Sequence, residues 1–291
     1  MTQVVRKIRP ADLLKSKSEG KKLVQLLVTN HRDASVADQA GADIITASDA
    51  AALMLFGMDS PMEMTLQDMA IVGRGVSKHV KRALTAVAMP YWSYQVSAEK
   101  AVENAGYLIR NTGADAVSCE VNRHHHEAIK AIVQAGIPVQ AHIGLSSQRL
   151  AQLGGVRGLG KTTAEACEFI EDAESMVDAG CFSIIAELLA SQVTKHIADS
   201  VSVPVISIGS GGDCDGQGGL FEDLCGLAGA HVPRHAAVYH RLQEQLEDGA
   251  TRFIEDVHSG AYPTSSHSVT MASAEARRFA SSTNRIKQVA L

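Results

Sequence analysis

A junction of helix, glycine and strand recurs along this 291-residue chain and constrains its fold more than any other feature. In QAGADIIT, NTGADAVS, QAGIPVQA and DAGCFSII, a glycine follows a helical pattern and precedes a short apolar run. A glycine at this position ends a helix in the left-handed conformation, and each apolar run has the length of a buried strand. Repeated units of this kind build a parallel sheet. The chain is therefore predicted to be an α/β protein.

The number of apolar runs favours a closed barrel over an open sheet. Strands are predicted at Leu23–Thr29, Asp43–Ala47, Thr85–Met89, Ala116–Val121, Pro138–Ile143, Phe182–Glu187, Val205–Gly209 and near Gly229–Val232. A (β/α)8 TIM barrel typically needs about 250 residues, so a single domain accounts for most of the chain. We expect residues 1–270 to form this (β/α)8 barrel.

The two ends of the chain differ from this pattern. Pro10–Glu19 is predicted to form an N-terminal helix that caps the barrel floor, with the lysine-rich segment Lys15–Lys22 on a solvated face. Residues 271–291 are polar and are predicted to form a C-terminal tail, in which Ala272–Ala280 makes one or two helical turns. The tail could instead dock on a neighbouring subunit.

Composition excludes several classes of function. Net charge is −5 and 20% of the residues are charged, so no basic face for nucleic acid is expected. The N-terminus has no apolar core of a signal peptide, and no apolar run approaches the length of a membrane span. The five cysteines have no CxxC spacing, as expected of reduced thiols in the cytoplasm. A small-molecule substrate is therefore expected.

Polar side chains close several of the predicted strands. Barrel enzymes carry their reactive groups at the C-terminal ends of the strands. The residues found there are His31, Ser48, Asp49, Glu120, His142, Glu187 and Ser210. Carboxylates that converge on one barrel mouth must share a cation or a proton. Oxygen ligands favour Mg²⁺ or Mn²⁺, and His142 as a further ligand would favour Zn²⁺, Mn²⁺ or Fe²⁺; the structural alternative is a set of salt bridges and strand caps.

Two further kinds of segment suggest ligands less specifically. The histidines His124, His125 and His126 cannot all bind one ion, because adjacent helical residues point in different directions. His124 could reach the mouth, but a partly exposed helix start is the favoured interpretation. The glycine-rich segment Ile208–Gly219 has neither a dinucleotide-binding order nor a Walker lysine, and is interpreted as a substrate or structural loop. Gly154–Gly160, followed by Lys161, is either a lid over the mouth or a plain connection.

Several motifs together resemble one known family. They are ASD at 47–49 followed by FGMDSPMEMTLQDM, AHIGL at 141–145, AEL at 186–188, PVISIGSG followed by DCDGQ, GAHVPR at 229–234 and SGAYP at 259–263. From about Lys7 to His267 the chain resembles the ketopantoate hydroxymethyltransferases, which belong to the isocitrate lyase and phosphoenolpyruvate mutase barrel superfamily. The resemblance implies the same barrel fold.

The resemblance also implies roles for four residues. Asp49 and Glu120 match carboxylates that surround Mg²⁺, which holds the 2-oxo acid substrate. Glu187 matches the base that forms the enolate, and His142 matches the histidine of the fifth strand. The implied reaction transfers a one-carbon unit from 5,10-methylenetetrahydrofolate to 3-methyl-2-oxobutanoate. Members of the family are homo-oligomers, and many are decamers.

Three positions depart from the family pattern inside the site. Ala88 stands where the family has a metal-binding Asp, while Ser118 and Ala50 stand where it has a Lys and a Ser that bind the substrate carboxylate. We expect these positions to line the substrate site, together with Ser48 and Ser210. Arg123 could supply a replacement cation for an anionic substrate, or could be a surface arginine.

Three hypotheses of function follow from these residues. The first is a hydroxymethyltransferase that enolises a 2-oxo acid, with the family's substrates or with related ones. The second is a lyase, hydrolase or mutase of the phosphoenolpyruvate mutase type, although Cys119 is expected to point away from the mouth because it alternates with Glu120. The third is a non-catalytic paralogue that binds a metabolite, as the losses at Ala50, Ala88 and Ser118 suggest.

Overall fold

The predicted parallel strands close into a barrel in the computed structural model, which describes residues 6–227 and 233–289. Each strand pairs in parallel with the next, and the last strand pairs with the first. The strands are β1 Leu23–Val28, β2 Ile44–Ala47, β3 Leu84–Ala88, β4 Ala116–Glu120, β5 Val139–Gly144, β6 Ser183–Glu187, β7 Val205–Ile208 and β8 Gly216–Leu220. The predicted (β/α)8 TIM barrel is confirmed.

The position of the eighth strand was predicted wrongly. The segment Gly229–Val232 lies outside the described residues. The barrel is closed by Gly216–Leu220, which overlaps the segment Ile208–Gly219 that was interpreted as a loop. Its sequence, GQGGL, has no β-branched residue. A Cβ atom at Gly216 would overlap the backbone carbonyl oxygen of Leu23 on β1, so the close approach of the two strands requires glycine there.

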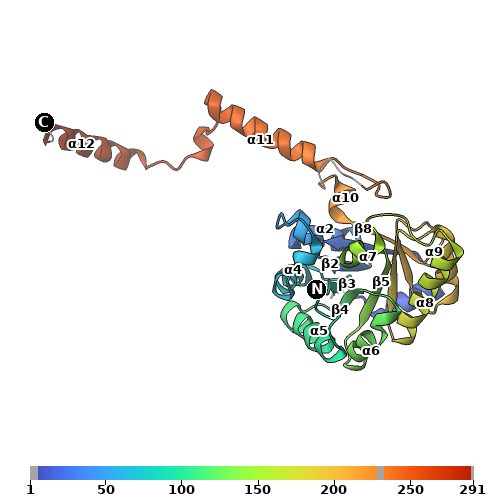
Figure 1. Cartoon of the computed structure of the whole chain (residues 1–291). Helices are drawn as coiled ribbons and strands as arrows, with labels where there is room; N and C mark the ends of the chain where they lie inside the picture. The colour runs from blue at the N-terminus through green and yellow to red at the C-terminus, as the bar shows by residue number, and fades with distance from the viewer. Residues whose placement is uncertain (1–5, 228–232, 290–291) are drawn as a thin grey trace. The chain divides into compact units, whose positions relative to one another are not determined.

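Helices surround the strands on the outside of the barrel. Figure 1 shows α2, α4, α5, α6, α8 and α9 as a ring around the sheet. The helices within residues 6–227 are α1 Pro10–Ser18, α2 His31–Ala40, α3 Ala51–Met54, α4 Leu66–His79, α5 Ala98–Thr112, α6 His126–Gln134, α7 Leu150–Leu153, α8 Thr163–Asp178, α9 Ser191–Ser200 and α10 Phe221–Cys225. The short 3-10 helices there are η1 Pro61–Glu63, η2 Arg123–His125 and η3 Ser147–Arg149.

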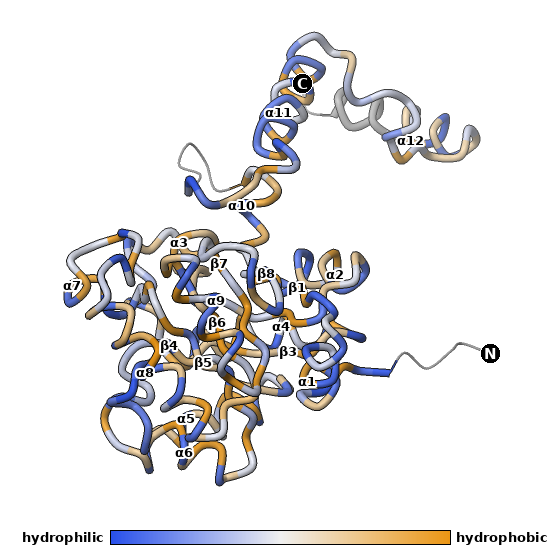
Figure 2. The backbone as a smooth tube through the Cα atoms, turned by 90° about the vertical axis from the view of Figure 1, so that its right-hand side faces the viewer, coloured by the Kyte–Doolittle hydropathy of each residue, from blue (hydrophilic) through white to orange (hydrophobic). Residues whose placement is uncertain are grey.

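The apolar core has two parts, one on each side of the sheet. The larger part lies between the strands and the surrounding helices, and it contains Cys119 beside Val117, as expected from the alternation of side chains along β4. The smaller part fills the lower barrel interior. In Figure 2 the hydrophobic segments gather in the strands. The upper interior is therefore left to polar side chains, which is where a barrel enzyme binds its substrate.

Helix α1 closes the floor of the barrel, as predicted. Leu13 is buried within the lower interior cluster. The expectation that the neighbouring lysines are all solvated is wrong for Lys17, whose Nζ donates to the carbonyls of Ala198 and Val203 at 2.8 and 3.0 Å and to Asp215 at 2.8 Å. This single ammonium group links the N-terminal helix to the end of the barrel.

The C-terminal residues form a unit of their own. Contacts within the chain divide it between His240 and Arg241. The second unit contains α11 Leu242–Ser259, η4 Ser265–His267 and α12 Ser273–Val289, so the helix at the end of the tail is longer than the expected one or two turns. Every residue of α11 is at least partly exposed, including Leu246 and Phe253.

Candidate active site

Three side chains from neighbouring strands meet at the C-terminal end of the barrel. Glu120 on β4 is the register partner of His142 on β5, and Glu187 closes β6 next to it. Because side chains alternate along a strand, Glu120 shares the interior face with Ser118, two residues earlier. The structure thus brings the residues predicted at the fourth, fifth and sixth strands to one mouth.

His142 and Glu187 form a hydrogen-bonded pair. His142 Nε2 lies 2.8 Å from Glu187 Oε2, and the His142 side chain is largely buried while that of Glu187 is 21% exposed. Burial by itself disfavours the charged imidazolium, but the hydrogen bond and charge of Glu187 outweigh it and raise the pKa of His142. The pair combines a carboxylate open to the mouth with a buried partner that can hold a proton.

Asp49 is a buried carboxylate on the same mouth. It follows β2 directly, and burial together with the nearby charge of Glu120 raises the pKa of Asp49 to about 7. The charge of His142 acts in the opposite direction. Glu120 therefore lies close enough to Asp49 for its charge to oppose the ionisation of Asp49, as expected of groups that share a cation or a proton.

Glu120 is held by donors from the loop after β5. Ser146 Oγ donates to Oε2 at 2.5 Å and Ser147 Oγ donates to Oε1 at 2.9 Å. The backbone N–H of Gln148 donates to Oε2 at 3.0 Å. A carboxylate can accept about four hydrogen bonds, so Glu120 keeps capacity for one further partner.

The predicted substrate positions of small size lie beside these acids. Ala88 is the last residue of β3 and the register partner of Ser118. Ser118 lies two residues before the end of β4. Ser48 is buried, and its hydroxyl accepts from the backbone N–H of Ala50 at 3.1 Å. These positions all carry short side chains, and their role in substrate binding stays a prediction.

Ser210 and Arg123 are engaged elsewhere in the fold. Ser210 Oγ accepts from the N–H of Leu189 and donates to the carbonyl of Ala186, both at 2.9 Å. The guanidinium of Arg123 lies 3.0 Å from the carboxylate of Asp172 on α8. These contacts support the structural alternative for both residues, and a role in substrate binding stays a prediction.

The remaining histidine candidates are not assembled with the acids. His31 begins α2 and its ring lies 4.8 Å from that of His79 on α4, between centroids. His124 is exposed, while His126 Nδ1 lies 3.1 Å from the carbonyl oxygen of Ser175. Among the described residues, none of the three hydrogen-bonds or pairs with Glu120 or Glu187.

The glycine-rich segment before α8 is anchored at one point. Leu159 is buried, its N–H donates to the carbonyl of Leu188 at 2.8 Å, and its carbonyl accepts from Ala190 at 2.9 Å. Lys161 is exposed, and its backbone N–H donates to Glu165. The segment thus runs beside the loop that follows Glu187, and whether it acts as a lid stays open.

Sequence reasoning missed two residues of the mouth, Tyr94 and Gln148. Tyr94 is buried, and its hydroxyl donates to the carbonyl of Glu120 at 2.8 Å and contacts Gln148 Oε1 at 2.9 Å. Neither residue closes a strand, so the strand-end criterion could not select them. The available signal was the polar run Ser146–Gln148 directly after the AHIGL motif.

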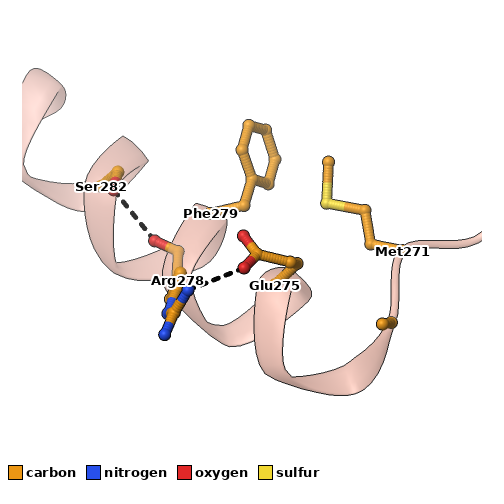
Figure 3. A pocket seen from close by; sticks show the side chains of 6 residues that line it. Met271, Glu275, Arg278, Phe279 and Ser282 are labelled. Atoms are coloured by element: carbon orange, nitrogen blue, oxygen red, sulfur yellow. Dashed lines mark hydrogen bonds and ion pairs between the residues drawn. The ribbon is translucent and has the colours of Figure 1, made fainter.

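Two hollows are lined by residues other than these carboxylates. One, of about 510 Å³, is lined only by exposed residues of the C-terminal unit, and Figure 3 shows its ion pair between Arg278 and Glu275. The other, of about 280 Å³, lies at the barrel floor around Leu13 and Asp43. A barrel enzyme acts at the opposite end of its strands, so neither hollow is the better candidate.

Comparison with known proteins decides the family. The model of the ketopantoate hydroxymethyltransferase family matches residues 7–265, which include every acid and histidine of the mouth. The chain belongs to the ketopantoate hydroxymethyltransferase family. Its members are transferases, and the resemblance seen in the sequence motifs is confirmed.

Relatives at the sequence level are similar over nearly their whole length. The chain is 38% identical over 262 residues to a 3-methyl-2-oxobutanoate hydroxymethyltransferase of Syntrophobacter fumaroxidans. The aligned region covers 90% of this chain and 93% of the relative. It is 39% identical over 263 residues to the enzyme of the same name from Staphylothermus marinus, covering 90% and 96%.

Solved structures support the fold at much lower sequence identity. Phosphoenolpyruvate phosphomutase from Streptomyces platensis subsp. rosaceus has a TM-score of 0.56 at 14% identity, covering 96% of this chain and 97% of its own. A 2,3-dimethylmalate lyase of the PEP mutase/isocitrate lyase superfamily has a TM-score of 0.56 at 14% identity, covering 96% and 98%. At this identity the solved structures show a fold like that of this chain, and nothing beyond the fold.

Proposed function

We propose that the barrel mouth enolises a 2-oxo acid and adds a hydroxymethyl group to it. The proposed acceptor is 3-methyl-2-oxobutanoate, and the proposed one-carbon donor is 5,10-methylenetetrahydrofolate. The observation that carries the proposal is the Glu187–His142 pair on the same mouth as the buried Asp49 and the half-buried Glu120. Family membership supports the choice of substrate.

Asp49 and Glu120 are proposed to hold a divalent metal ion, Mg²⁺ first and Mn²⁺ or Zn²⁺ as alternatives. Mg²⁺ is commonly held by one or two carboxylates together with water and substrate oxygens, so this donor set fits. The described residues contain no group of three or more His, Cys, Asp or Glu that could bind a metal, so the remaining ligands would be water and substrate. A bound metal ion would polarise the substrate carbonyl and acidify the neighbouring C–H.

Glu187 is proposed as the base that removes this proton. Its Oε2 is bonded to His142, while Oε1 makes no hydrogen bond with any described residue and is the oxygen available to the substrate. His142 holds the carboxylate in one orientation, and it can share the proton that Glu187 takes up. Glu187 can then return the proton to a later intermediate.

Substrate recognition is proposed to depend on Ser48, Ser118 and the space above Ala50 and Ala88. Ser48 and Ser118 are buried, so their hydroxyls can hydrogen-bond a substrate without competition from bulk water. Ser210 and Arg123 would have to leave existing partners to take part. We therefore rank them below the first four positions.

Proton exchange tests the proposal before the one-carbon donor is known. The C3 proton of 3-methyl-2-oxobutanoate is followed by NMR in D2O with and without Mg²⁺, Mn²⁺ or Zn²⁺, for the wild type and Glu187→Gln. We expect metal-dependent exchange, and a fall of about 10²-fold or more in the variant, as is usual when a general base is removed. The matched control is Glu171→Gln on α8, whose side chain is 62% exposed.

Two results would redirect the assignment. Exchange that is equal in the wild type and in Glu187→Gln would remove Glu187 from the role of base. A folded protein that exchanges no proton with any metal would favour a lyase or mutase activity on another substrate, or a non-catalytic role. The solved lyases and mutases support only the fold for that alternative, because their identity to this chain is 13–16%.

A homo-oligomer in the cytoplasm is proposed as the working state, and a decamer as its size. Helix α11 exposes Leu246, Phe253, Ile254 and Val257 at 45–61% along one amphipathic helix, which favours burial against another copy. The five cysteines are all unpaired, as expected in a reducing compartment. Within residues 6–227 and 233–289, every helix falls short of the apolar length that a bilayer crossing requires.

A further inference from the structure

Gln148 contacts both carboxylates of the proposed cation site. It lies in η3, directly after the loop that follows β5, and it is buried. Its backbone N–H donates to Glu120 Oε2 at 3.0 Å, and its side-chain Nε2 lies 3.4 Å from Asp49 Oδ2. Glu120 ends β4 and Asp49 follows β2, so one residue spans two strands that are not neighbours in the barrel.

The orientation of the Gln148 amide is fixed from both ends by backbone groups. The N–H of Tyr94 donates to Gln95 Oε1 at 3.2 Å, so Gln95 must present its Nε2 to Gln148 Oε1, which lies 3.1 Å away. On the other side, Gln148 Nε2 donates to the carbonyl of Met89 at 3.0 Å. A backbone N–H can only donate and a carbonyl can only accept, so the amide cannot turn over. Asp49 therefore always faces an N–H donor.

A second link ties this amide to the strand that carries Glu120. The hydroxyl of Tyr94 donates to the carbonyl of Glu120 at 2.8 Å and lies 2.9 Å from Gln148 Oε1. Gln148 is thereby joined to Glu120 in two ways: its backbone N–H donates to the Glu120 carboxylate, and its side-chain amide is linked through Tyr94 to the Glu120 carbonyl.

Two carboxylates in one buried site repel each other and would turn apart without a fixed partner. We propose that Gln148 is a positioning residue that holds Asp49 and Glu120 in the arrangement that binds the divalent cation. This inference rests on the proposed function, because it concerns the same cation. Gln148 itself presents a donor to Asp49, so it acts through the carboxylates and not as a ligand.

The test measures Mn²⁺ affinity in the absence of substrate. Free Mn²⁺ is followed by electron paramagnetic resonance for the full-length wild type, Gln148→Met, Tyr94→Phe and Gln152→Met. Gln152 is the matched control, since it is an exposed glutamine in the same segment whose side-chain carbonyl accepts a hydrogen bond from Arg149. We expect Gln148→Met to weaken Mn²⁺ binding about tenfold, about 1.4 kcal/mol. Tyr94→Phe should weaken it about threefold, and Gln152→Met should match the wild type.

Asp49→Asn identifies the site at which Mn²⁺ binds, since removing a ligand should abolish the measured binding. If Gln148→Met and Tyr94→Phe bind Mn²⁺ as the wild type does, while Asp49→Asn does not, Gln148 has no positioning role and the proposed cation site stands. If the wild type binds no Mn²⁺, or Asp49→Asn binds as well as the wild type, the cation site of the proposed function fails and the inference fails with it.

Kinetics separate positioning from a general loss of structure. The reaction measured is exchange of the C3 proton of 3-methyl-2-oxobutanoate at saturating Mn²⁺. Under these conditions Gln148→Met should regain most of the wild-type kcat, because excess cation compensates for the weaker site. A loss of kcat that no Mn²⁺ concentration restores, together with an unfolding midpoint well below that of Gln152→Met, would assign Gln148 to the fold and overturn the proposal.

Discussion

His142 Nε2 lies 2.8 Å from Glu187 Oε2, and the two residues sit on the paired strands β5 and β6. This contact joins the proposed base to a group whose pKa is raised by it. It therefore links the pH dependence of stability to the geometry of the active site.

The stabilisation from this pair is expected to fall as the pH rises. The folded pKa of His142 is raised above its unfolded value of about 6.5, so the pair contributes fully below pH 6.5 and loses its contribution as the pH passes the folded pKa. Replacing His142 by Gln should lower the free energy of unfolding by about 1 to 2 kcal/mol more at pH 6 than at pH 9. Urea denaturation at both pH values measures this, and an equal loss at both would contradict the charged pair.

Asp49 is expected to behave in the opposite way, since its ionisation is opposed by the folded protein. Its folded pKa is raised to about 7, so without metal the free energy of unfolding falls as the pH rises from about 4 to about 7. Asp49→Asn should therefore gain about 3 kcal/mol over the wild type between pH 5 and pH 8. Denaturation in EDTA measures the difference, and a constant difference across this range would show that Asp49 is not destabilised by its charge.

Gly144 is expected to control the position of Glu187. Its φ is +93°, and a Cβ atom there would overlap the backbone carbonyl oxygen of Glu187. Gly144→Ala should lower the free energy of unfolding by more than about 2 kcal/mol. It should also reduce proton exchange, because the Cβ would overlap β6, which carries Glu187. Gly136→Ala is the control, with φ +86° and open space around the Cβ, and should cost about 1 kcal/mol without loss of exchange. If the two variants had equal effects, backbone strain alone would explain both, and Gly144 would have no particular effect on the position of Glu187.

Lys17 is expected to stabilise the barrel far more than its neighbour Lys15. Lys17→Met leaves two carbonyls and Asp215 without their cationic partner. The substitution should lower the free energy of unfolding by about 2 to 3 kcal/mol. Lys15 is 73% exposed and pairs only with Glu19, so Lys15→Met should stay within about 0.5 kcal/mol of the wild type. Thermal unfolding of both variants checks the difference, which would vanish if Lys17 were solvated.

The sequence predicted seven strands because their residues carry the preference for that structure themselves. The runs that form β5 and β6 are apolar, follow a helix-ending glycine and need no information from distant parts of the chain. Gly216–Leu220 carries no such preference, and its glycines are selected by contact with other strands: a Cβ at Gly218 would approach Ile208 to 3.2 Å. Local patterns could not reveal a strand that is defined by its neighbours.

The residues of the candidate site also fall into two groups: those placed by the strands that carry them, and those placed by contacts with distant parts of the chain. Asp49, Glu120, His142 and Glu187 end strands, so their convergence follows from the barrel alone. Gln148 lies in η3, its amide is oriented by Gln95 and by the carbonyl of Met89, and its position therefore depends on how the segment after β5 packs. Local sequence predicts a solvated Lys17, because its carbonyl partners lie about 180 residues away and no local pattern reveals them.

The bond between Lys17 and Asp215 spans 198 residues, which gives the order of synthesis a structural meaning. Helix α1 precedes all eight strands in the chain, whereas six strands precede the Lys17 partners Ala198 and Val203, and seven precede Asp215. Until Asp215 is made, the first strand has no eighth strand beside it and the Lys17 ammonium group has no Asp215 carboxylate to pair with. A nascent chain halted before Asp215 therefore remains an open sheet, and closure of the barrel is one of the last events available to the growing polypeptide.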